Sequence, residues 1–152
     1  MGTPEICVRR ARQDDCKWIL KWRNHPNTRR YFLNPEPIDA DTHCAWFAAI
    51  LPDTQHRHLL IAEDAASCPI GVVRFDEEGN SAWVDIYLDP ERHGHGFGKA
   101  MLDVALQWLE SNSSVRKVYA DVLAENAASM RMFASAGFEN TMCRFSLDLS
   151  RS

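Results

Sequence analysis

The sequence predicts an α/β (α+β) fold, with a mixed central sheet of about six to seven strands and about four helices on its faces. Short apolar runs of strand length alternate along the chain with segments whose apolar residues recur every three or four positions. A glycine-rich loop at residues 94–98 joins one such strand to one such helix. The expected order is therefore strand, two helices, three strands, helix, strand, helix and strand.

The N-terminal third is expected to hold one strand and two helices. The strand covers residues 6–10, and the first helix begins at Asp14 or Asp15 and runs to about residue 22. The sequence Asn-His-Pro-Asn at 24–27 ends that helix. Asp39 is a good N-cap for a second helix that continues to residue 51. The residues of this second helix expected to face the core are Cys44, Phe47 and Leu51.

The middle of the chain is expected to form three strands, at residues 59–62, 70–75 and 82–88. A turn that begins at Cys68-Pro69 precedes the second strand. The sequence Glu-Glu-Gly-Asn at 77–80 is a hairpin signal between the second and the third. These strands place the glycine-rich loop directly after the third of them.

The C-terminal part alternates helix and strand. A helix at about 96–110 follows the glycine loop, and a strand is expected at 118–123. The next helix covers 126–136, and Gly137 supplies its left-handed stop. Residues 138–149 contain the last strand or strands, although only 14 residues follow Phe138. Either these strands are compressed, or one is missing and a second subunit completes the sheet in a homodimer.

Three alternate glycines form the most informative motif. Gly94, Gly96 and Gly98 lie between a strand and a helix, so backbone N–H groups can converge there without obstruction by Cβ atoms. The helix N-terminus adds roughly +0.5 of partial charge. Together these features predict an anion site, most plausibly for a pyrophosphate. The motif is neither the G-x-G-x-x-G dinucleotide fingerprint nor a Walker loop.

Length and composition restrict the function classes. Residues 1–152 are expected to form one domain, and the net charge of −4 argues against a dedicated nucleic-acid binder. No apolar run approaches 18 residues and the N-terminus has no signal-peptide character, so we expect no membrane span and a cytoplasmic location. The five cysteines are scattered and form no C-x-x-C, which indicates reduced thiols and no metal site.

Two motifs carry a resemblance to a known family. Residues 93–98, His-Gly-His-Gly-Phe-Gly, resemble the R/Q-x-x-G-x-G/A motif of the GNAT superfamily of acyl-CoA N-acyltransferases, although His93 stands where Arg or Gln is usual and Arg92 lies one residue early. Residues 126–138 resemble that family's Asn-x-x-(Ser/Ala)-x-x-x-Tyr…Gly-Phe helix. The resemblance covers nearly the whole chain. It implies a single GNAT domain that uses acetyl-CoA as cosubstrate, needs no metal and transfers acetyl to a primary amine.

A finer resemblance lies in the first third of the chain. Residues 21–28, Lys-Trp-Arg-Asn-His-Pro-Asn-Thr, are similar to the amino-sugar N-acetyltransferases of the pseudaminic-acid pathway, whose broader relatives acetylate ribosomal-protein N-termini. This implies that the acceptor is the 4-amino group of a UDP-linked amino sugar. The residues that it indicates for substrate binding are Trp22, Arg23, Asn24, His25, Arg30 and His43.

The resemblance also assigns the coenzyme contacts. Backbone groups of Ile86, Tyr87 and Leu88 would pair with the pantetheine arm. Residues 93–99 would hold the pyrophosphate, and Asn126 would bond the pantetheine amide. The full expected set is Ile86, Tyr87, Leu88, His93, Gly94, His95, Gly96, Phe97, Gly98, Lys99, Asn126, Ser129 and Phe133. Simpler alternatives remain open, because Ile86 and Leu88 also suit a sheet core, Lys99 suits a solvated face and Asn126 suits a helix cap.

Acetyl transfer to an amine needs a base, because an alkylammonium with a pKa near 10 is almost wholly protonated at pH 7. Asp121 is the first candidate, on the strand expected at 118–123, and Asp85 is the second. Either carboxylate could instead face solvent or pair with an arginine. His25 and His58 are the further candidates.

Phe133 departs from the family pattern, which has tyrosine as the proton donor to the leaving sulfur. Phenylalanine keeps only the packing role, so the reaction is expected to be slower rather than abolished. A water molecule or Ser129 could replace the donor.

Charge bears on the acceptor. Residues 1–61 hold nine Lys or Arg and seven Asp or Glu, so this part is basic although the whole chain is acidic. Such a bias suits an anionic acceptor, whereas Trp22 and Trp46 are more often core residues than stacking platforms. The alternatives are acetylation of protein N-termini or another small amine, and a non-catalytic CoA-binding module. Product assays with each class of acceptor separate them.

Overall fold

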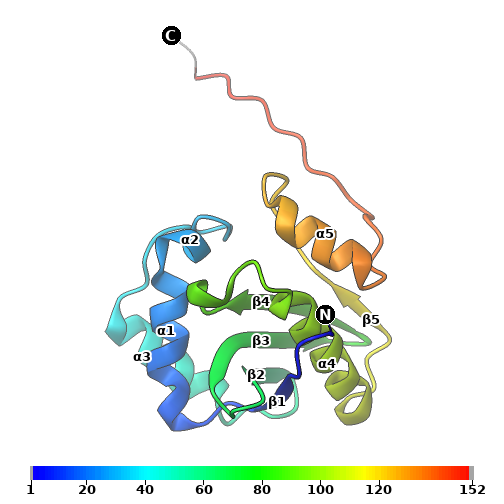
Figure 1. The fold of residues 1–152 in the computed structure, drawn as a ribbon. Coiled ribbons are helices and arrows are strands. Elements are labelled where there is room, and N and C mark those ends of the chain that lie inside the picture. The colour runs from blue at the N-terminus through cyan, green and yellow to red at the C-terminus, as the bar shows by residue number, and fades with distance from the viewer. Residues whose placement is uncertain (1, 151–152) are drawn as a thin grey trace.

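The structure, a computed structural model, describes residues 2–150. Its centre is one five-stranded sheet with the strand order β1-β2-β3-β4-β5 (Figure 1). The pairs β1–β2, β2–β3 and β3–β4 are antiparallel, and the pair β4–β5 is parallel. The mixed sheet is therefore confirmed, with five strands among the described residues. The strands are β1 (Cys7–Arg10), β2 (Arg57–Glu63), β3 (Pro69–Glu78), β4 (Ser81–Leu88) and β5 (Lys117–Tyr119).

Helices cover both faces of the sheet, and each side has its own core (Figure 1). On one side Ile19, Trp22 and Phe47 pack against alternate residues of β2 such as Leu59 and Ile61. On the other side the intervening residues of β2 pack against the helix that follows the glycine loop. The helices are η1 (Gln13–Asp15), α1 (Cys16–Asn24), α2 (Pro26–Arg29), α3 (Ala40–Ile50), η2 (Pro90–Arg92), α4 (Phe97–Asn112) and α5 (Ala127–Ser135).

The N-terminal helices differ from the prediction in two details. The chain does break at 24–27, but Pro26 then begins the short helix α2, because proline suits the first helical position and His25 caps it through Nδ1. In α3, Asp39 is the N-cap as predicted. Two of the three residues expected to face the core are replaced there by the residue one position earlier. Cys44 is exposed, and His43 is buried together with Phe47 and Ile50.

Burial of His43 has a specific cause. Its Nε2 lies 3.0 Å from the carbonyl oxygen of Cys16, so a polar ring nitrogen is satisfied between α1 and α3. Burial lowers the pKa of His43, which keeps the ring neutral at pH 7. The periodicity of apolar residues alone could not predict a buried histidine at this place.

The predicted strand at 118–123 forms only in its first part. Register partners between β4 and β5 are limited to Ser81 with Lys117, Ala82 with Val118 and Trp83 with Tyr119. Residues 120–123 continue the chain outside any strand. Beyond Trp83 the two strands have separated, so residues 120–123 lack a strand partner within the described part of the chain.

The prediction for residues 138–149 was wrong within the described chain. Residues 139–150 form an extended, fully exposed arm that leaves the end of α5 and runs away from the sheet (Figure 1). Gly137 does adopt the predicted left-handed conformation, with φ +96°. Every residue of the arm is exposed, so the arm takes part neither in the sheet nor in either core.

The start of α4 is set by a close approach to the sheet. Gly71 on β3 leaves no room for a side chain, because a Cβ there would lie 2.8 Å from the Tyr87 carbonyl oxygen and closer still to the end of Met101. Met101 belongs to α4, so the absence of a side chain at Gly71 allows the helix to pack closely on β3 and β4. No helix within residues 2–150 is both long and apolar enough to cross a bilayer.

Candidate active site

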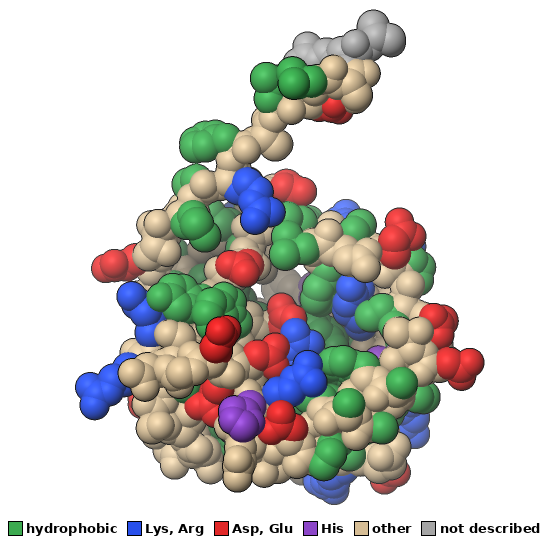
Figure 2. Space-filling view, turned by 180° about the vertical axis from the view of Figure 1, so that it is seen from behind, with side chains coloured by type: hydrophobic (Ala, Val, Ile, Leu, Met, Phe, Trp, Pro, Cys, Tyr) green, Lys and Arg blue, Asp and Glu red, His purple; other side chains and the backbone are tan. Residues whose placement is uncertain are grey.

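A cavity of about 1190 Å³ opens where β4 and β5 separate. Its walls come from the second half of β4, residues 121–123, the start of α4, the inner face of α5, and the segment from α2 to residue 34. The view from behind shows a hollow below the arm, with acidic and basic side chains beside it (Figure 2). Gly94, Gly96 and Gly98 of the glycine loop line this cavity, which is large enough for an extended ligand.

The glycine loop presents unpaired backbone donors. Gly94 and Gly96 have φ values of +82° and +78°, a left-handed conformation that strongly favours glycine. The six N–H groups of residues 94–99 donate to no acceptor among residues 2–150. Gly96 is the N-cap of the 16-residue helix α4, and the first turn of that helix contains no acidic residue. Such a group of donors at a helix N-terminus is suited to an anion.

The two histidines of the loop are placed differently. His93 lines the cavity, and burial, with a smaller effect from His25, lowers its pKa, so it is neutral at pH 7. His95 and Phe97 are absent from the cavity wall and pack edge to face, with ring centroids 6.5 Å apart. Lys99 lines the cavity, while its ammonium contacts Asp103 one turn along α4. The anion site thus relies on backbone donors more than on these side chains.

The remaining predicted coenzyme residues line the cavity: Ile86, Tyr87, Leu88, Asn126, Ser129 and Phe133. Asn126 is the N-cap of α5, since its Oδ1 accepts the Ser129 N–H at 3.1 Å. Phe133 is 8% exposed and packs edge to face on Phe138, so it belongs to both the core and the cavity wall. Burial raises the pKa of Tyr87 far above its ordinary value, which keeps its phenol protonated.

The two candidate bases differ in their partners. Asp85 accepts a hydrogen bond from Nη2 of Arg74 at 2.8 Å, and Nε of Arg74 also donates to Asp76. Asp121 lines the cavity, is exposed and has no hydrogen-bond partner among the described residues. It follows β5 rather than lying on it, so the predicted position on a strand is corrected. Of the two carboxylates, Asp85 is paired with an arginine, and Asp121 has no such partner within residues 2–150.

Two of the six predicted substrate residues line the cavity, namely Arg23 and Arg30. The Arg23 guanidinium lies 3.8 Å above the centre of the Phe32 ring, and its Nη2 donates to the Asn34 carbonyl oxygen at 2.9 Å. Nη1 of Arg23 is buried without a hydrogen-bond partner among the described residues, and burial lowers the pKa of this group. A buried, unsatisfied cationic donor at a cavity wall favours an acceptor oxygen on the ligand.

The other four have places in the scaffold. Trp22 is 3% exposed and stacks on Trp18 in the core. Asn24 holds residue 38, because its side-chain amide bonds both the N–H and the carbonyl of Ile38. His25 caps α2 and His43 is buried against Cys16. The structure does not bring these four side chains into the cavity wall.

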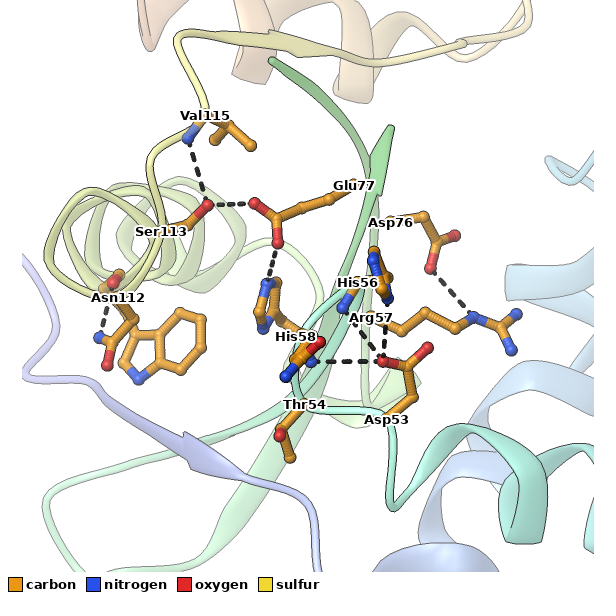
Figure 3. Close-up of polar contacts among 12 residues, drawn as sticks. Asp53, Thr54, His56, Arg57, His58, Asp76, Glu77, Asn112, Ser113 and Val115 are labelled. Atoms are coloured by element: carbon orange, nitrogen blue, oxygen red, sulfur yellow. Dashed lines mark hydrogen bonds and ion pairs between the residues drawn. The ribbon is translucent and has the colours of Figure 1, made fainter. Parts of the chain in front are cut away.

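His58 lies at a separate cluster (Figure 3). Its Nε2 is 2.7 Å from Oε2 of Glu77, and the other oxygen of that carboxylate, Oε1, accepts a hydrogen bond from the Ser113 hydroxyl. Nη2 of Arg10 lies 3.3 Å from Nδ1 of His58. Because the arginine can only donate, Nδ1 is the acceptor and Nε2 carries the proton given to Glu77. This buried cluster fastens the end of α4 to β2 and β3 and lies outside the cavity wall.

Sequence reasoning missed Arg74 and Asp76, which line the cavity from β3. The available signal was a charged residue inside a strand that is otherwise apolar, since Arg74 stands between Val73 and Phe75. Charged residues are rarely placed in such a run without a partner. Within residues 2–150 no group of His, Cys, Asp or Glu is arranged to hold a metal ion.

Comparisons with known proteins agree with this geometry. A family model described as "Acetyltransferase (GNAT) domain" matches residues 5–139. Spermidine N(1)-acetyltransferase of Vibrio cholerae is 25% identical over 138 residues, which cover 88% of this chain and 79% of that protein. The uncharacterized protein MJ1062 of Methanocaldococcus jannaschii is 23% identical over 140 residues, which cover 90% of this chain but only 28% of that protein.

A solved structure supports the fold. The crystal structure of spermidine N-acetyltransferase from Vibrio cholerae, in complex with CoA and spermine, superposes with a TM-score of 0.83. The two sequences are 24% identical, and the match covers 91% of this chain and 83% of that one. At this level of identity the likeness concerns the fold.

Proposed function

The chain belongs to the acetyltransferase (GNAT) domain family, and from this premise we propose that it is an acetyl-CoA-dependent N-acetyltransferase acting on a primary amine. The observation that carries the proposal is the group of six N–H donors at residues 94–99, which have no acceptor within residues 2–150 and belong to the loop that lines the cavity between β4 and β5. These donors fit a diphosphate, because a helix N-terminus and converging amides favour negative charge.

The rest of the cavity fits an extended thioester carrier. On the side away from β3, residues 86–88 of β4 have no strand partner within residues 2–150, so backbone groups on that side can pair with amides of the pantetheine arm. Asn126 offers an amide nitrogen in addition to its capping oxygen. Bound acetyl-CoA supplies the thioester carbonyl that the amine attacks. The separation of β4 from β5 at Trp83 provides the gap for such an arm.

Asp121 is proposed to take the proton from the acceptor ammonium, directly or through water. Its carboxylate has no partner among the described residues, whereas Asp85 is held by Arg74. Phe133 cannot give a proton to the departing sulfur, so water or Ser129 would have that task. A thiolate with a pKa near 8.5 is a tolerable leaving group without a dedicated acid.

For the acceptor, we propose the 4-amino group of a nucleotide-linked amino sugar. The support is the cationic side of the cavity, where Arg23 has an unsatisfied buried Nη1 and Arg30 lines the wall. Arg74 neutralises part of the charge of Asp76 and Asp85. An anionic group on the acceptor suits this wall better than a polycation does.

The test is a product assay by mass spectrometry with three acceptors. A UDP-linked 4-amino sugar is expected to be acetylated, and spermidine and a peptide with a free N-terminus are expected to react poorly. Preferred turnover of spermidine or of the peptide would overturn the assignment of the acceptor and leave acetyl transfer intact. Calorimetry with CoA is the companion measurement. Binding without turnover of any amine would identify a non-catalytic CoA-binding module, and no binding by folded protein would overturn the whole proposal.

A further inference from the structure

Two of the five cysteines come together from different helices. Cys16 is the first residue of α1, and Cys44 belongs to α3, which lies beside α1 (Figure 1). His43, next to Cys44 in the chain, bonds the Cys16 carbonyl oxygen through its Nε2 at 3.0 Å. This contact holds the start of α1 against the turn of α3 that carries Cys44. The two cysteines therefore stand where these helices meet, outside the cavity wall.

The two thiols differ in their surroundings. Cys16 packs on the core that contains Phe47, and Phe47 lies three residues after Cys44 on the same side of α3. Cys44 itself is exposed, whereas Cys16 is half-buried. Burial and, to a smaller extent, the neighbouring Cys44 thiol raise the pKa of the Cys16 thiol. The packing and this mutual influence agree that the two sulfur atoms are neighbours, with Cys44 as the accessible one.

We propose that Cys16 and Cys44 are a redox-active dithiol, which a small-molecule disulfide converts into an intramolecular disulfide. The exposed Cys44 attacks as the thiolate, forms a mixed disulfide with one half of the small molecule and releases the other half as a thiolate. Cys16 then loses its proton to solvent, and its sulfur attacks that of Cys44 and releases the second thiolate. Two protein thiols are oxidised and one small disulfide is reduced to two thiols. Excess thiol reverses both steps.

The other three cysteines are not placed to form such a bond with each other. Cys7 and Pro69 pair with the same β2 residue from opposite sides. Cys7 and the adjoining Cys68 are therefore about two strand spacings apart, roughly 9–10 Å, beyond the roughly 7 Å between Cα atoms that a disulfide spans. Cys143 lies on the arm that runs away from the sheet (Figure 1). All three are exposed, so an added disulfide is expected to leave only mixed disulfides on them.

The bond closes residues 16–44 into a loop that includes part of the cavity wall. Arg23, Arg30 and most of the cavity-lining segment 27–34 lie inside this loop, whereas the glycine loop and α4 lie outside it. A crosslink between two points of a chain reduces the conformations open to the segment between them. Oxidation is therefore expected to restrain the N-terminal wall of the cavity and to leave α4 as it is. This consequence is independent of which amine is the acceptor.

Mass spectrometry of the wild type tests the bond. The reduced protein is incubated with oxidised glutathione, free thiols are blocked with N-ethylmaleimide, and peptides are mapped without reduction. One crosslinked pair of peptides, joining Cys16 to Cys44, is expected. The matched control Cys44→Ser keeps Cys16 and is expected to give no crosslink, while the three remaining exposed cysteines react as in the wild type. Glutathione retained on Cys44 beside a blocked Cys16, or maleimide on both cysteines, would overturn the proposal.

Thermal unfolding and hydrogen exchange then compare the reduced with the oxidised wild type. The Tm of the oxidised protein is expected to rise by about 5–10 °C and to return after reduction with dithiothreitol. Amide exchange is expected to slow across residues 23–39 and to stay unchanged in α4. Treatment of Cys44→Ser with oxidised glutathione should change neither quantity. A bond that forms without slowing exchange at residues 23–39 contradicts the proposed restraint of the cavity wall.

Discussion

Arg74 and Asp85 lie directly opposite each other on β3 and β4 and form a cross-strand ion pair at 2.8 Å. The same guanidinium holds Asp76, so two of the carboxylates at the cavity are already partnered. Asp121, which also lines the cavity, has no such partner in the part of the chain that the structure describes. This difference is the basis for proposing Asp121, rather than Asp85, as the base.

We therefore expect Asp121→Asn to lower kcat by about 10²-fold or more, since that is the usual contribution of a positioned base. Asp85→Asn is the matched control and should lower kcat far less, because its carboxylate is occupied by Arg74. Rates measured at rising pH provide a further check, because a pre-deprotonated amine reduces the need for a base. A larger loss from Asp85→Asn than from Asp121→Asn would reverse the assignment.

The glycine loop gives a second prediction. Gly96→Ala creates no clash, since nothing lies within 4 Å of the added Cβ, but it strains the left-handed backbone by about 1–2 kcal/mol. If the loop backbone rotates to relieve that strain, its N–H donors turn away from the diphosphate, so the Kd for CoA should rise about tenfold. The control is Gly79→Ala, where φ is +61° in the hairpin between β3 and β4. It should cost similar stability and leave CoA binding unchanged, as measured by calorimetry.

Much of the scaffold around the glycine loop could be predicted from local sequence. Gly96 as the start of α4, Asp39 and Asn126 as caps, and Gly137 as a stop each depend on the chemistry of a few adjacent residues. The GNAT fold class followed from the same patterns with the family resemblance.

Long-range relations could not be predicted in this way. The burial of His43 depends on the carbonyl of Cys16, 27 residues away in the sequence. The end of strand structure after Tyr119 depends on the separation of β4 from β5 beyond Trp83. The prediction of strands at residues 138–149 was wrong for the same reason. Their alternating pattern specifies a strand, but a strand forms only where another edge is available. At the cavity, the sequence allowed Asp85 to pair with an arginine, but only the register of β3 against β4 identifies Arg74 as that partner.

Arg23 supplies a third prediction. Arg23→Met removes the unsatisfied buried Nη1 together with the guanidinium contacts to the Phe32 ring and to the Asn34 carbonyl oxygen. For an acceptor that carries a phosphate, KM should rise about 10- to 100-fold, because one charge-assisted hydrogen bond to the acceptor is lost. For a neutral amine of similar size, KM should hardly change. Arg29→Met is the control, since Arg29 lies outside the main cavity. An equal effect of Arg23→Met on both acceptors would argue for a purely structural role.

Asp15 makes stability depend on pH. Burial opposes its ionisation, but two hydrogen bonds from Arg9 and one from the Arg12 N–H hold the pKa of Asp15 below its usual range. Because the pKa is depressed in the folded state, the stabilisation is complete above the unfolded value near 3.9. It is lost as pH falls through the lower folded value. Asp15→Asn should cost about 2–3 kcal/mol at pH 7 and flatten the acid limb of stability measured by urea unfolding.

Phe133 permits a gain-of-function test. The ring lines the cavity and is 8% exposed, so a hydroxyl added in Phe133→Tyr can reach the cavity. If no efficient acid now protonates the departing sulfur, kcat should rise about tenfold or more, within the range of general acid catalysis. The gain should fade at high pH as the phenol ionises, whereas a packing effect would be independent of pH. Phe138→Tyr, on the packing partner of Phe133, is the control and should leave kcat unchanged. An unaltered kcat in a stable Phe133→Tyr protein would show that water or Ser129 already supplies the proton without limiting the rate.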